Sequence, residues 1–369
     1  MTHKKPTLLI AGGSHAEIPL INAGKALGFH VISSGNRPQD LGHQIADEVK
    51  LADFSDREAM LTLATQNGID GICAGCNDFA ALSAAYVAQK LNLPGHDNLE
   101  VAELIHYKDR YREFAQMNKI PTPKARGFNA LDSAISGLNY FQLPVIVKPV
   151  DLTGGKGIAR ADSLKEARDA ILAAFEKSRA KRVVIEDFIE GSRHAVSTLV
   201  RNGKVVFYFY DDEHYYQNPY LVSAASSPGD VRAQIISRLI AIIQGIAQRL
   251  GLVTGIIHVQ FIVDEDGEPV IIEICRRAPG DLYIRFVQYA TGVDYPEYIV
   301  RAATGMDCDS LSQPEGQKVI LRHCSMARRQ GEVRDVIVDN SVAKNIFDQL
   351  VWWRSGDFIE DPLTQKLGI

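Results

Sequence analysis

The stretch from Gly255 to Asp281, GIIHVQFIVDEDGEPVIIEICRRAPGD, constrains the fold more than any other part of this chain. Two apolar, β-branched runs, residues 256–263 and 270–274, flank the turn sequence Asp264-Glu265-Asp266-Gly267. Such runs around an Asp-Gly pair predict a β-hairpin, because these turn residues tolerate positive φ angles. Gln260 and Glu273 fall inside the predicted strands, and antiparallel pairing would bring them toward one point.

The residues that follow this hairpin allow two interpretations of its role. Cys275, Arg276, Arg277 and Asp281 follow the second strand. A carboxylate, an amide and guanidinium groups at one end of a sheet are suited to a cation that holds phosphates beside an anionic substrate. A surface hairpin with solvated polar faces explains the same residues. The hairpin alone leaves both interpretations open.

Composition excludes several classes of protein. With 369 residues, 46% hydrophobic and 23% charged, the chain has the make-up of a globular protein with two or three packed units. A net charge of −5 and the lack of a basic run argue against nucleic acid as a partner. The apolar run Leu8 to Ala11 is too short for a signal-peptide core or a membrane span. We therefore expect a cytoplasmic protein that contacts neither membrane nor nucleic acid.

The five cysteines form no disulfide framework. Cys73 and Cys76 lie in a C-x-x-C at the end of an apolar run, where a redox pair is one interpretation. The chain has no second such pair to complete a zinc site, so we favour small buried thiols.

The first hundred residues alternate between strand and helix patterns. Strands are predicted at 7–11, 29–33, about 46–51 and 70–74, and helices at 18–27, 56–67 and 78–91. This alternation predicts a doubly wound parallel sheet whose ligands lie at the carboxyl ends of the strands. The turns there, 12–15, 34–37 and 75–78, lack the G-x-G-x-x-G spacing of a dinucleotide site, so a nicotinamide-dependent dehydrogenase is not favoured.

A second unit begins after a helical stretch, residues 100–118, which ends at Ile120-Pro121-Thr122-Pro123. Lys148 lies on the short apolar strand 145–149, where its charge is costly unless it faces an anion. The glycine-rich loop 152–158 follows, and its backbone N–H groups could wrap phosphate oxygens. It is not a P-loop, since Gly157 follows Lys156 where Ser or Thr is required. A flexible hairpin tip is the alternative, but the lysine before it favours phosphate contact.

The remaining elements complete an α+β pattern. Strands are predicted at 182–188, 195–200 and 205–210, a polar aromatic loop at 211–220 and a long helix at 230–250. The hairpin follows, then a largely helical stretch, 286–303, and a tail of strands with a helix near 341–347.

The motifs of this chain, in order, are Lys108, the lysine of VIVKP, the TGGKG loop, the IEDFIEGSRH segment and the HVQF…IIEICRR hairpin. In this order they resemble the motifs of the ATP-grasp superfamily. The resemblance covers nearly the whole chain. It implies an α/β protein whose N-terminal doubly wound parallel-sheet domain (1–100) precedes the two α+β subdomains of an ATP-grasp fold. These would be a helical linker with a lid (101–187) and a catalytic subdomain with an antiparallel sheet (188–369).

The resemblance also implies roles for individual residues. Lys108 and Lys148 would contact the α and β phosphates of ATP, and Gly154, Gly155 and Gly157 would close over the β and γ phosphates. The side chain of Glu186 and the backbones of Asp187 and Ile189 would hold adenine, and His194 the ribose. An exposed residue at a strand start is the alternative for His194.

The metal site departs from the superfamily pattern. Gln260 stands where an acidic residue is usual, and Cys275 where Asn is usual, whereas Glu273 matches. Gln can offer one neutral oxygen to Mg²⁺ or Mn²⁺, while a thiol is a poor ligand for a hard cation. We therefore expect Gln260 and Glu273 as metal ligands, with water and ATP oxygens completing the shell.

The implied reaction activates a carboxylate with ATP as an acyl phosphate, which an amine then captures. Lys148, Glu273 and Arg277 would serve catalysis. Arg277, Asp281, Tyr216 and Ser223 would contact the substrate carboxylate and amine, with loops such as Ser14-His15 and Asn77-Asp78 nearby. Activation of bicarbonate or formate and a non-catalytic ATP-binding protein are the alternatives, and a homodimer is the expected assembly.

Overall fold

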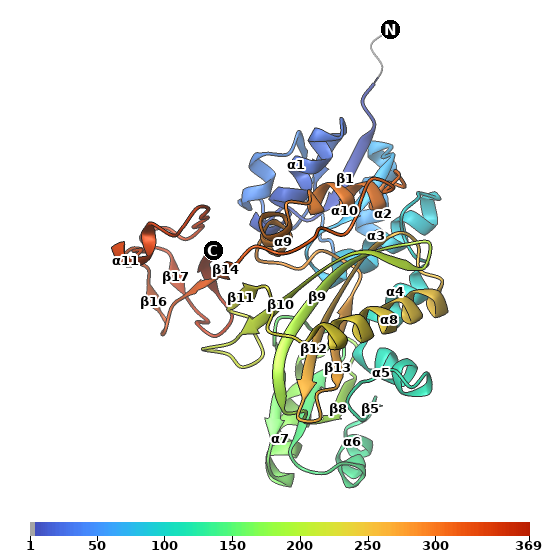
Figure 1. The fold of residues 1–369 in the computed structure, drawn as a ribbon, viewed down its shortest axis with the longest axis vertical. Coiled ribbons are helices and arrows are strands. Elements are labelled where there is room, and N and C mark those ends of the chain that lie inside the picture. Colours follow the sequence, from blue (N-terminus) through green and yellow to red (C-terminus); the bar gives the residue numbers. More distant parts are fainter. Residues whose placement is uncertain (1–3) are drawn as a thin grey trace.

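A four-stranded parallel sheet begins the computed structural model, which describes residues 4–369. Its strands run in the order β3-β2-β1-β4, as predicted for a doubly wound unit (Figure 1). The elements are β1 (Thr7–Ala11), α1 (Ile18–Ala26), β2 (His30–Ser33), β3 (Glu48–Val49), α2 (Arg57–Asn67), β4 (Gly71–Ala74) and α3 (Asp78–Leu91), with 3-10 turns at His15–Glu17 and Leu41–Gln44. Asp56 caps α2 through its side chain, and Gly68, at a φ of 54°, ends that helix.

The helical stretch that follows is broken, whereas the sequence predicted one helix over 100–118. α4 (Leu99–His106) and α5 (Lys108–Met117) are separated by Tyr107, which is extended with φ −78° and ψ 112°. The break lets the Lys108 N–H donate to the Val150 carbonyl at 3.1 Å. Lys108 therefore lies beside the end of the strand that carries Lys148.

A second, antiparallel sheet of four strands, in the order β5-β8-β6-β7, forms the end of the molecule opposite the N-terminal unit (Figure 1). Its strands are β5 (Ala125–Phe128), β6 (Val145–Pro149), β7 (Ala159–Ala161) and β8 (Val183–Asp187). Helices α6 (Leu131–Gly137) and α7 (Leu164–Lys177), with a 3-10 turn at Leu138–Tyr140, cover its apolar face.

The largest sheet is antiparallel and has the order β13-β12-β9-β10-β11-β14. Its strands are β9 (Gly191–Arg201), β10 (Lys204–His214), β11 (Ala224–Ser227), β12 (Gly255–Asp264), β13 (Pro269–Cys275) and β14 (Ile320–His323). The predicted hairpin is confirmed: Gln260 lies opposite Glu273, and a bulge follows directly after Gln260. β10 is longer than predicted, because residues 211–214, expected in a loop, pair with β9 and β11.

Helices cover both faces of this sheet. α8 (Ala233–Leu250) packs Ile236, Leu239 and Ile243 against one face. α9 (Tyr283–Thr291) and α10 (Tyr295–Ala303) share a core with the other face and with α1 and β1 of the N-terminal unit. The N-terminal sheet and the large sheet are thereby joined through one continuous core.

The C-terminal residues form an arm beside β11 (Figure 1). It contains two short strand pairs, β15 (Ser325–Met326) with β18 (Lys366–Gly368) and β16 (Gly331–Glu332) with β17 (Phe358–Ile359), and helix α11 (Asn340–Ala343). α11 is shorter than the helix predicted at 341–347. Among residues 4–369, no helix has the length and apolarity needed to cross a membrane. The boundaries 1–100, 101–187 and 188–369 stay a prediction.

Candidate functional site

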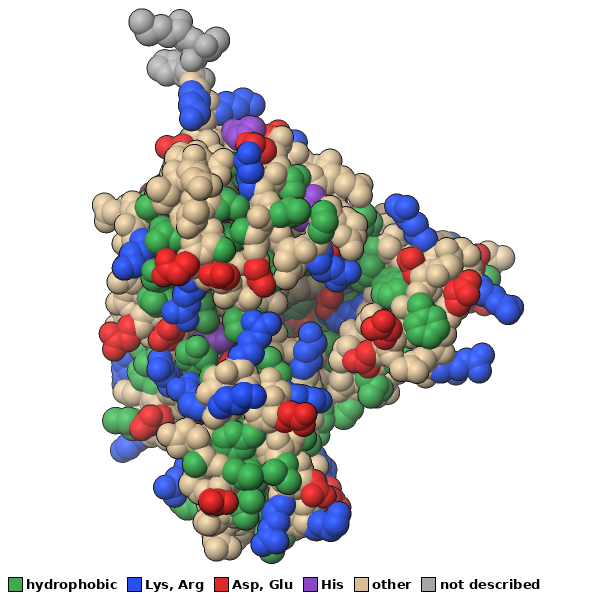
Figure 2. Space-filling model, turned by 180° about the vertical axis from the view of Figure 1, so that it is seen from behind, with side chains coloured by type: hydrophobic (Ala, Val, Ile, Leu, Met, Phe, Trp, Pro, Cys, Tyr) green, Lys and Arg blue, Asp and Glu red, His purple; other side chains and the backbone are tan. Residues whose placement is uncertain are grey.

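A cavity lies between the second sheet and the largest sheet. Residues from β6, β8, β10, β12, β13 and α5 line it, together with the loop after β10. The polar lining residues are Lys108, Lys148, Glu186, Asp187, Arg193, Glu213, Tyr215, Tyr220, Gln260 and Glu273. The apolar ones include Ile146, Ile158, Phe188, Ile189, Ile262 and Ile272. Figure 2 shows that Lys and Arg side chains gather around a hollow at the middle of one face of the molecule.

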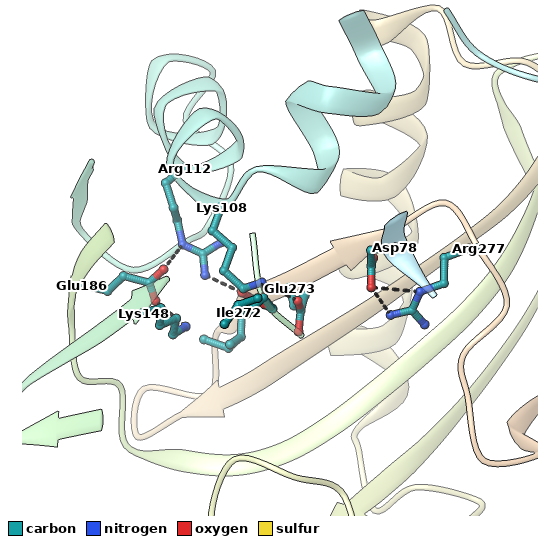
Figure 3. Close-up of polar contacts among 9 residues, drawn as sticks. Asp78, Lys108, Arg112, Lys148, Glu186, Ile272, Glu273 and Arg277 are labelled. Carbon is teal, nitrogen blue, oxygen red and sulfur yellow. Dashed lines mark hydrogen bonds and ion pairs between the residues drawn. The ribbon is translucent and has the colours of Figure 1, made fainter. Parts of the chain in front are cut away.

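The two predicted lysines meet in this cavity from different parts of the chain. Lys148 comes from β6 and Lys108 from the first turn of α5 (Figure 3). Lys108 Nζ donates to the Leu152 carbonyl at 2.8 Å and lies 3.0 Å from Glu273 Oε1. Both lysines are almost buried. Two lysines that line one largely desolvated cavity are suited to an anionic ligand.

Glu186 lies at the centre of a buried ion network that the sequence analysis missed. Its carboxylate accepts from Lys148 Nζ at 2.7 Å and from Arg112 Nε at 2.9 Å (Figure 3). Burial alone would raise the pKa of Glu186, but the two cations outweigh burial and lower it to about 2. Glu186 therefore positions Lys148. Its predicted contact with adenine is not tested by these distances.

Arg112 had a signal in the sequence. It lies four residues after Lys108, and this spacing puts two side chains on one face of a helix. Arg112 also donates to the Ile272 carbonyl, so it connects α5 to both sheets that border the cavity.

The segment after β8 offers a backbone edge to the cavity. The N–H groups of Asp187 and Phe188 donate to the carbonyls of Lys124 and Pro144. The N–H of Ile189 has no acceptor within residues 4–369, and Ile189 lines the cavity. An unused backbone donor beside apolar side chains fits a flat heterocycle such as adenine. The adenine contacts of Asp187 and Ile189 stay predictions.

The glycine-rich loop after β6 is held in left-handed backbone conformations. Gly154, Gly155 and Gly157 have φ values of 65°, 74° and 74°. A Cβ on Gly155 would lie 2.7 Å from the Tyr220 carbonyl oxygen, whereas one on Gly154 would meet nothing within 4 Å. Gly155 therefore lets the loop lie directly against the segment that follows β10.

We expect Gly155→Ala to weaken binding of a non-hydrolysable ATP analogue by about tenfold relative to Gly154→Ala. Both variants introduce about 1–2 kcal/mol of left-handed strain, but only Gly155→Ala forces the loop away from Tyr220. Isothermal titration calorimetry measures the difference. Equal affinities for the two variants would contradict a closing role for this loop.

His194 lies outside the cavity lining. Its Nδ1 is 2.6 Å from Asp212 Oδ1, and its Nε2 is 2.6 Å from Ser192 Oγ. The side chain is buried, and burial lowers its pKa. His194 is therefore not the exposed strand-start residue of the alternative interpretation. Both ring nitrogens are engaged within the chain, and the predicted ribose contact stays a prediction.

Oxygen donors gather on the cavity side of the large sheet. Glu273 and Gln260 line the cavity as opposite residues of β13 and β12. Glu213, from β10, lies beside them and accepts from Gln260 Nε2 at 2.6 Å. Burial raises the pKa of Glu213 to about 7, and the nearby charge of Glu273 adds to this rise. The hydrogen bonds from Tyr215 and Gln260 lower the pKa but do not outweigh burial.

The oxygens of Glu273 and Gln260 are suited to a hard divalent cation whose remaining ligands are phosphates and water. Residues 4–369 contain no group of three His, Cys, Asp or Glu side chains able to hold a metal. Glu273 and the Gln260 amide are nevertheless oxygen donors, and Mg²⁺ usually binds one or two carboxylates together with phosphates and water. Cys275 is buried, and burial raises the pKa of its thiol to about 12, so the thiol stays protonated.

Arg277 pairs with Asp78 of the N-terminal unit. Arg277 Nε and Nη2 donate to Asp78 Oδ2 at 3.2 and 2.7 Å (Figure 3). Burial would raise the pKa of Asp78, but the Arg277 charge and its hydrogen bonds hold the pKa below its usual value. The pair lines a second cavity, between α3, β4 and the exit of β13. The structure thus places Asp78 beside Arg277, and the substrate contacts expected of residues 77–78 stay a prediction.

The other predicted substrate residues lie toward the C-terminal arm. Asp281 pairs with Lys366, and its backbone carbonyl accepts from Arg322. Tyr216 donates to the Cys324 carbonyl, while Ser223 is fully buried at the start of β11. None of Asp281, Tyr216 and Ser223 lines the cavity that holds Lys108 and Lys148. Their substrate roles stay predictions.

Comparison with known proteins identifies the fold. Residues 107–216 match the family described as phosphoribosylglycinamide synthetase, ATP-grasp (A) domain. An L-amino acid ligase from Bacillus licheniformis superposes with a TM-score of 0.83 at 21% identity, covering 100% of this chain and 93% of the other. The biotin carboxylase domain of the Hydrogenobacter thermophilus 2-oxoglutarate carboxylase superposes with a TM-score of 0.79 at 19% identity, covering 99% and 86%.

Curated sequences give a likeness that covers less of the chain. The phosphoribosylamine–glycine ligase of Pseudomonas aeruginosa is 24% identical over 285 residues, which cover 67% of this chain and 66% of that enzyme. The corresponding ligases of Haemophilus influenzae and Pseudomonas syringae are matched over 53% and 44% of their length. The chain thus spans between about half and two thirds of these relatives.

Proposed function

We propose that this chain, whose predicted resemblance to the ATP-grasp superfamily is confirmed by these comparisons, is an ATP-dependent ligase. It would activate a carboxylate as an acyl phosphate and join it to an amine, releasing ADP and phosphate. The observation that carries the proposal is the cavity that Lys108 and Lys148, from two parts of the chain, line together with Gln260 and Glu273.

Phosphoryl transfer needs positioning and charge neutralisation, and different residues of the cavity would supply each of them. Lys108 and Lys148 would hold phosphate oxygens, with Glu186 and Arg112 fixing Lys148. The Ile189 N–H and nearby apolar side chains would hold adenine. The loop 154–157 would cover the phosphates and keep water from the reactive acyl group.

Mg²⁺, or Mn²⁺ in its place, would supply positive charge that neutralises the phosphates during transfer. Glu273 and Gln260 would hold that cation. Lys108, 3.0 Å from Glu273, would keep the carboxylate oriented toward the phosphates. In relatives, an ADP complex with magnesium is described for the Hydrogenobacter thermophilus domain.

The substrates would be a small carboxylate and a small amine, since relatives include an L-amino acid ligase and phosphoribosylamine–glycine ligases. Arg277, with Asp281, Tyr216 and Ser223, would face them. Bicarbonate or formate activation is the first alternative, and a non-catalytic ATP-binding protein is the second, motivated by Gln260 and Cys275. A cytoplasmic location and a homodimer stay predictions.

One screen tests these three functions. We expect Mg²⁺-dependent ADP release that requires a carboxylate and an amine together, measured against a panel of amino acids, small carboxylates and bicarbonate. ADP release with bicarbonate or formate alone would favour the first alternative. ATP binding without turnover for every combination would favour the second.

Glu273→Ala is expected to lower this ADP release by about 10²–10³-fold, because it removes the acidic donor nearest the phosphates. Glu265→Ala, an exposed carboxylate at the tip of the same hairpin, is the matched control and should leave turnover unchanged. Normal turnover in Glu273→Ala would refute the metal assignment.

A further inference from the structure

Glu213 is an acidic residue of the cavity to which no role has yet been given. It lies on β10, two strands away from Gln260 on β12, with β9 between them. The residue of β9 opposite Gln260 is Ala195. Because Ala195 has only a methyl group, side chains from β10 and β12 can meet across β9, and Glu213 Oε1 lies 2.6 Å from Gln260 Nε2.

This contact decides which way the amide of Gln260 faces. Gln260 Nε2 donates to Glu213 Oε1, so the NH₂ group of the amide is the end that faces Glu213. The carbonyl oxygen then lies at the other end of the planar amide, and β12 lies between β10 and β13, the strand of Glu273. That oxygen makes no hydrogen bond within residues 4–369.

Glu213 is itself fixed from the other side. Its Oε2 accepts from the Tyr215 hydroxyl at 2.6 Å, and the Arg193 guanidinium lies over the Tyr215 ring at 4.6 Å. The carboxylate is therefore held in one place, and it can act as a rigid support for the amide.

We propose that Glu213 is a positioning residue that turns the Gln260 carbonyl oxygen toward Glu273, so that a neutral amide serves as a ligand of the divalent cation, with Glu213 as the second carboxyl group beside the site. The proposal rests on the proposed function, because it concerns the cation that accompanies ATP. It explains how a site with Gln at position 260 keeps two carboxyl groups near the metal.

The test measures Mn²⁺ affinity by electron paramagnetic resonance in the presence of a non-hydrolysable ATP analogue, and therefore needs no turnover. Glu213→Gln should weaken Mn²⁺ binding about tenfold, because it removes the charge and lets the amide rotate. Gln260→Glu should not bind Mn²⁺ more tightly than the wild type, because two carboxylates then face each other. The exchanged variant Glu213→Gln/Gln260→Glu restores the hydrogen bond and the net charge, and its affinity should return to within about threefold of the wild type.

The outcomes separate the hypotheses. Glu265→Gln removes the same charge from the hairpin tip and should match the wild type. An exchanged variant that binds Mn²⁺ no better than Glu213→Gln overturns the proposal. If Glu213 only supports Tyr215, Glu213→Gln will keep the wild-type affinity for Mn²⁺, and that result overturns the proposal as well. A wild-type protein that binds neither Mn²⁺ nor the nucleotide overturns the proposed function itself. If Glu213→Gln does not fold, Glu213→Asp takes its place, because it keeps the carboxylate but shortens its reach to the Gln260 amide. Wild-type affinity for Mn²⁺ in Glu213→Asp overturns the proposal.

Discussion

Glu186→Gln should lower the free energy of unfolding by about 3–5 kcal/mol, because it leaves the charges of Arg112 and Lys148 buried without a partner. The side chains of Arg112, Glu186 and Lys148 are 2%, 2% and 7% exposed. The pKa of Glu186, lowered from 4.5 to about 2, corresponds to about 3 kcal/mol, which agrees with that range. Urea denaturation measures the loss, and Glu113→Gln, on the exposed face of α5, is the control expected to change stability by less than about 0.5 kcal/mol.

The pH dependence of this loss follows from the sign of the pKa shift. Because the folded-state pKa is depressed, ionised Glu186 contributes its full stability above about pH 4.5, and this contribution is lost as the pH falls toward about 2. The stability difference between wild type and Glu186→Gln should therefore be constant from pH 7 to 5 and shrink below pH 4.5. A difference that stays the same down to pH 3 would contradict the network as the source of the effect.

The parts of the fold that were predictable depend on local pattern. Alternating apolar residues and the Asp266-Gly267 turn set the register that places Gln260 opposite Glu273. Strand and helix alternation likewise predicted the N-terminal parallel sheet. In these segments the pattern that decides whether a strand or a helix forms repeats within a few residues.

The missed features depend on partners that are distant in sequence. Glu213 was expected in a loop, because polar residues follow Tyr210, yet pairing with β9 and β11 carries β10 on to His214. The sequence shows no alternation of apolar and polar residues past Tyr210, and only the burial in the structure alternates, through Phe207, Phe209 and Asp211. Arg112 and Glu186 are 74 residues apart, and Asp78 and Arg277 are 199 apart. No local pattern reports such pairings.

The break between α4 and α5 shows how tertiary contact overrides periodicity. Residues 100–118 contain neither Gly nor Pro, so one continuous helix was the reasonable expectation. The N–H of Lys108 bonds instead to Val150, at the end of the strand that presents Lys148. The break at Tyr107 thus brings Lys108 to the site, and it is a departure from local preference where function is proposed.

Arg277→Lys should lower kcat/KM for carboxylate-dependent ADP release by about 10²–10³-fold. Arg277 presents a rigid fork of N–H donors, of which Nε and Nη2 contact Asp78 and Nη1 contacts the Ala278 carbonyl. Lysine keeps the positive charge that Asp78 requires but cannot grip a second carboxylate in a bidentate manner. The variant should therefore stay folded while it loses rate, as steady-state kinetics and circular dichroism would show together.

Asp78→Asn distinguishes the contribution of the Asp78–Arg277 pair to stability from the role of Arg277 in binding the substrate carboxylate. It leaves the Arg277 guanidinium buried without its counter-charge, so it should cost about 3–5 kcal/mol of stability while the fork of Arg277 remains intact. Added carboxylate substrate should then raise the melting temperature of Asp78→Asn more than that of the wild type, because the substrate anion replaces the missing charge. If substrate stabilises both proteins equally and Arg277→Lys turns over normally, Arg277 only joins the N-terminal unit to the large sheet, and the carboxylate must bind elsewhere.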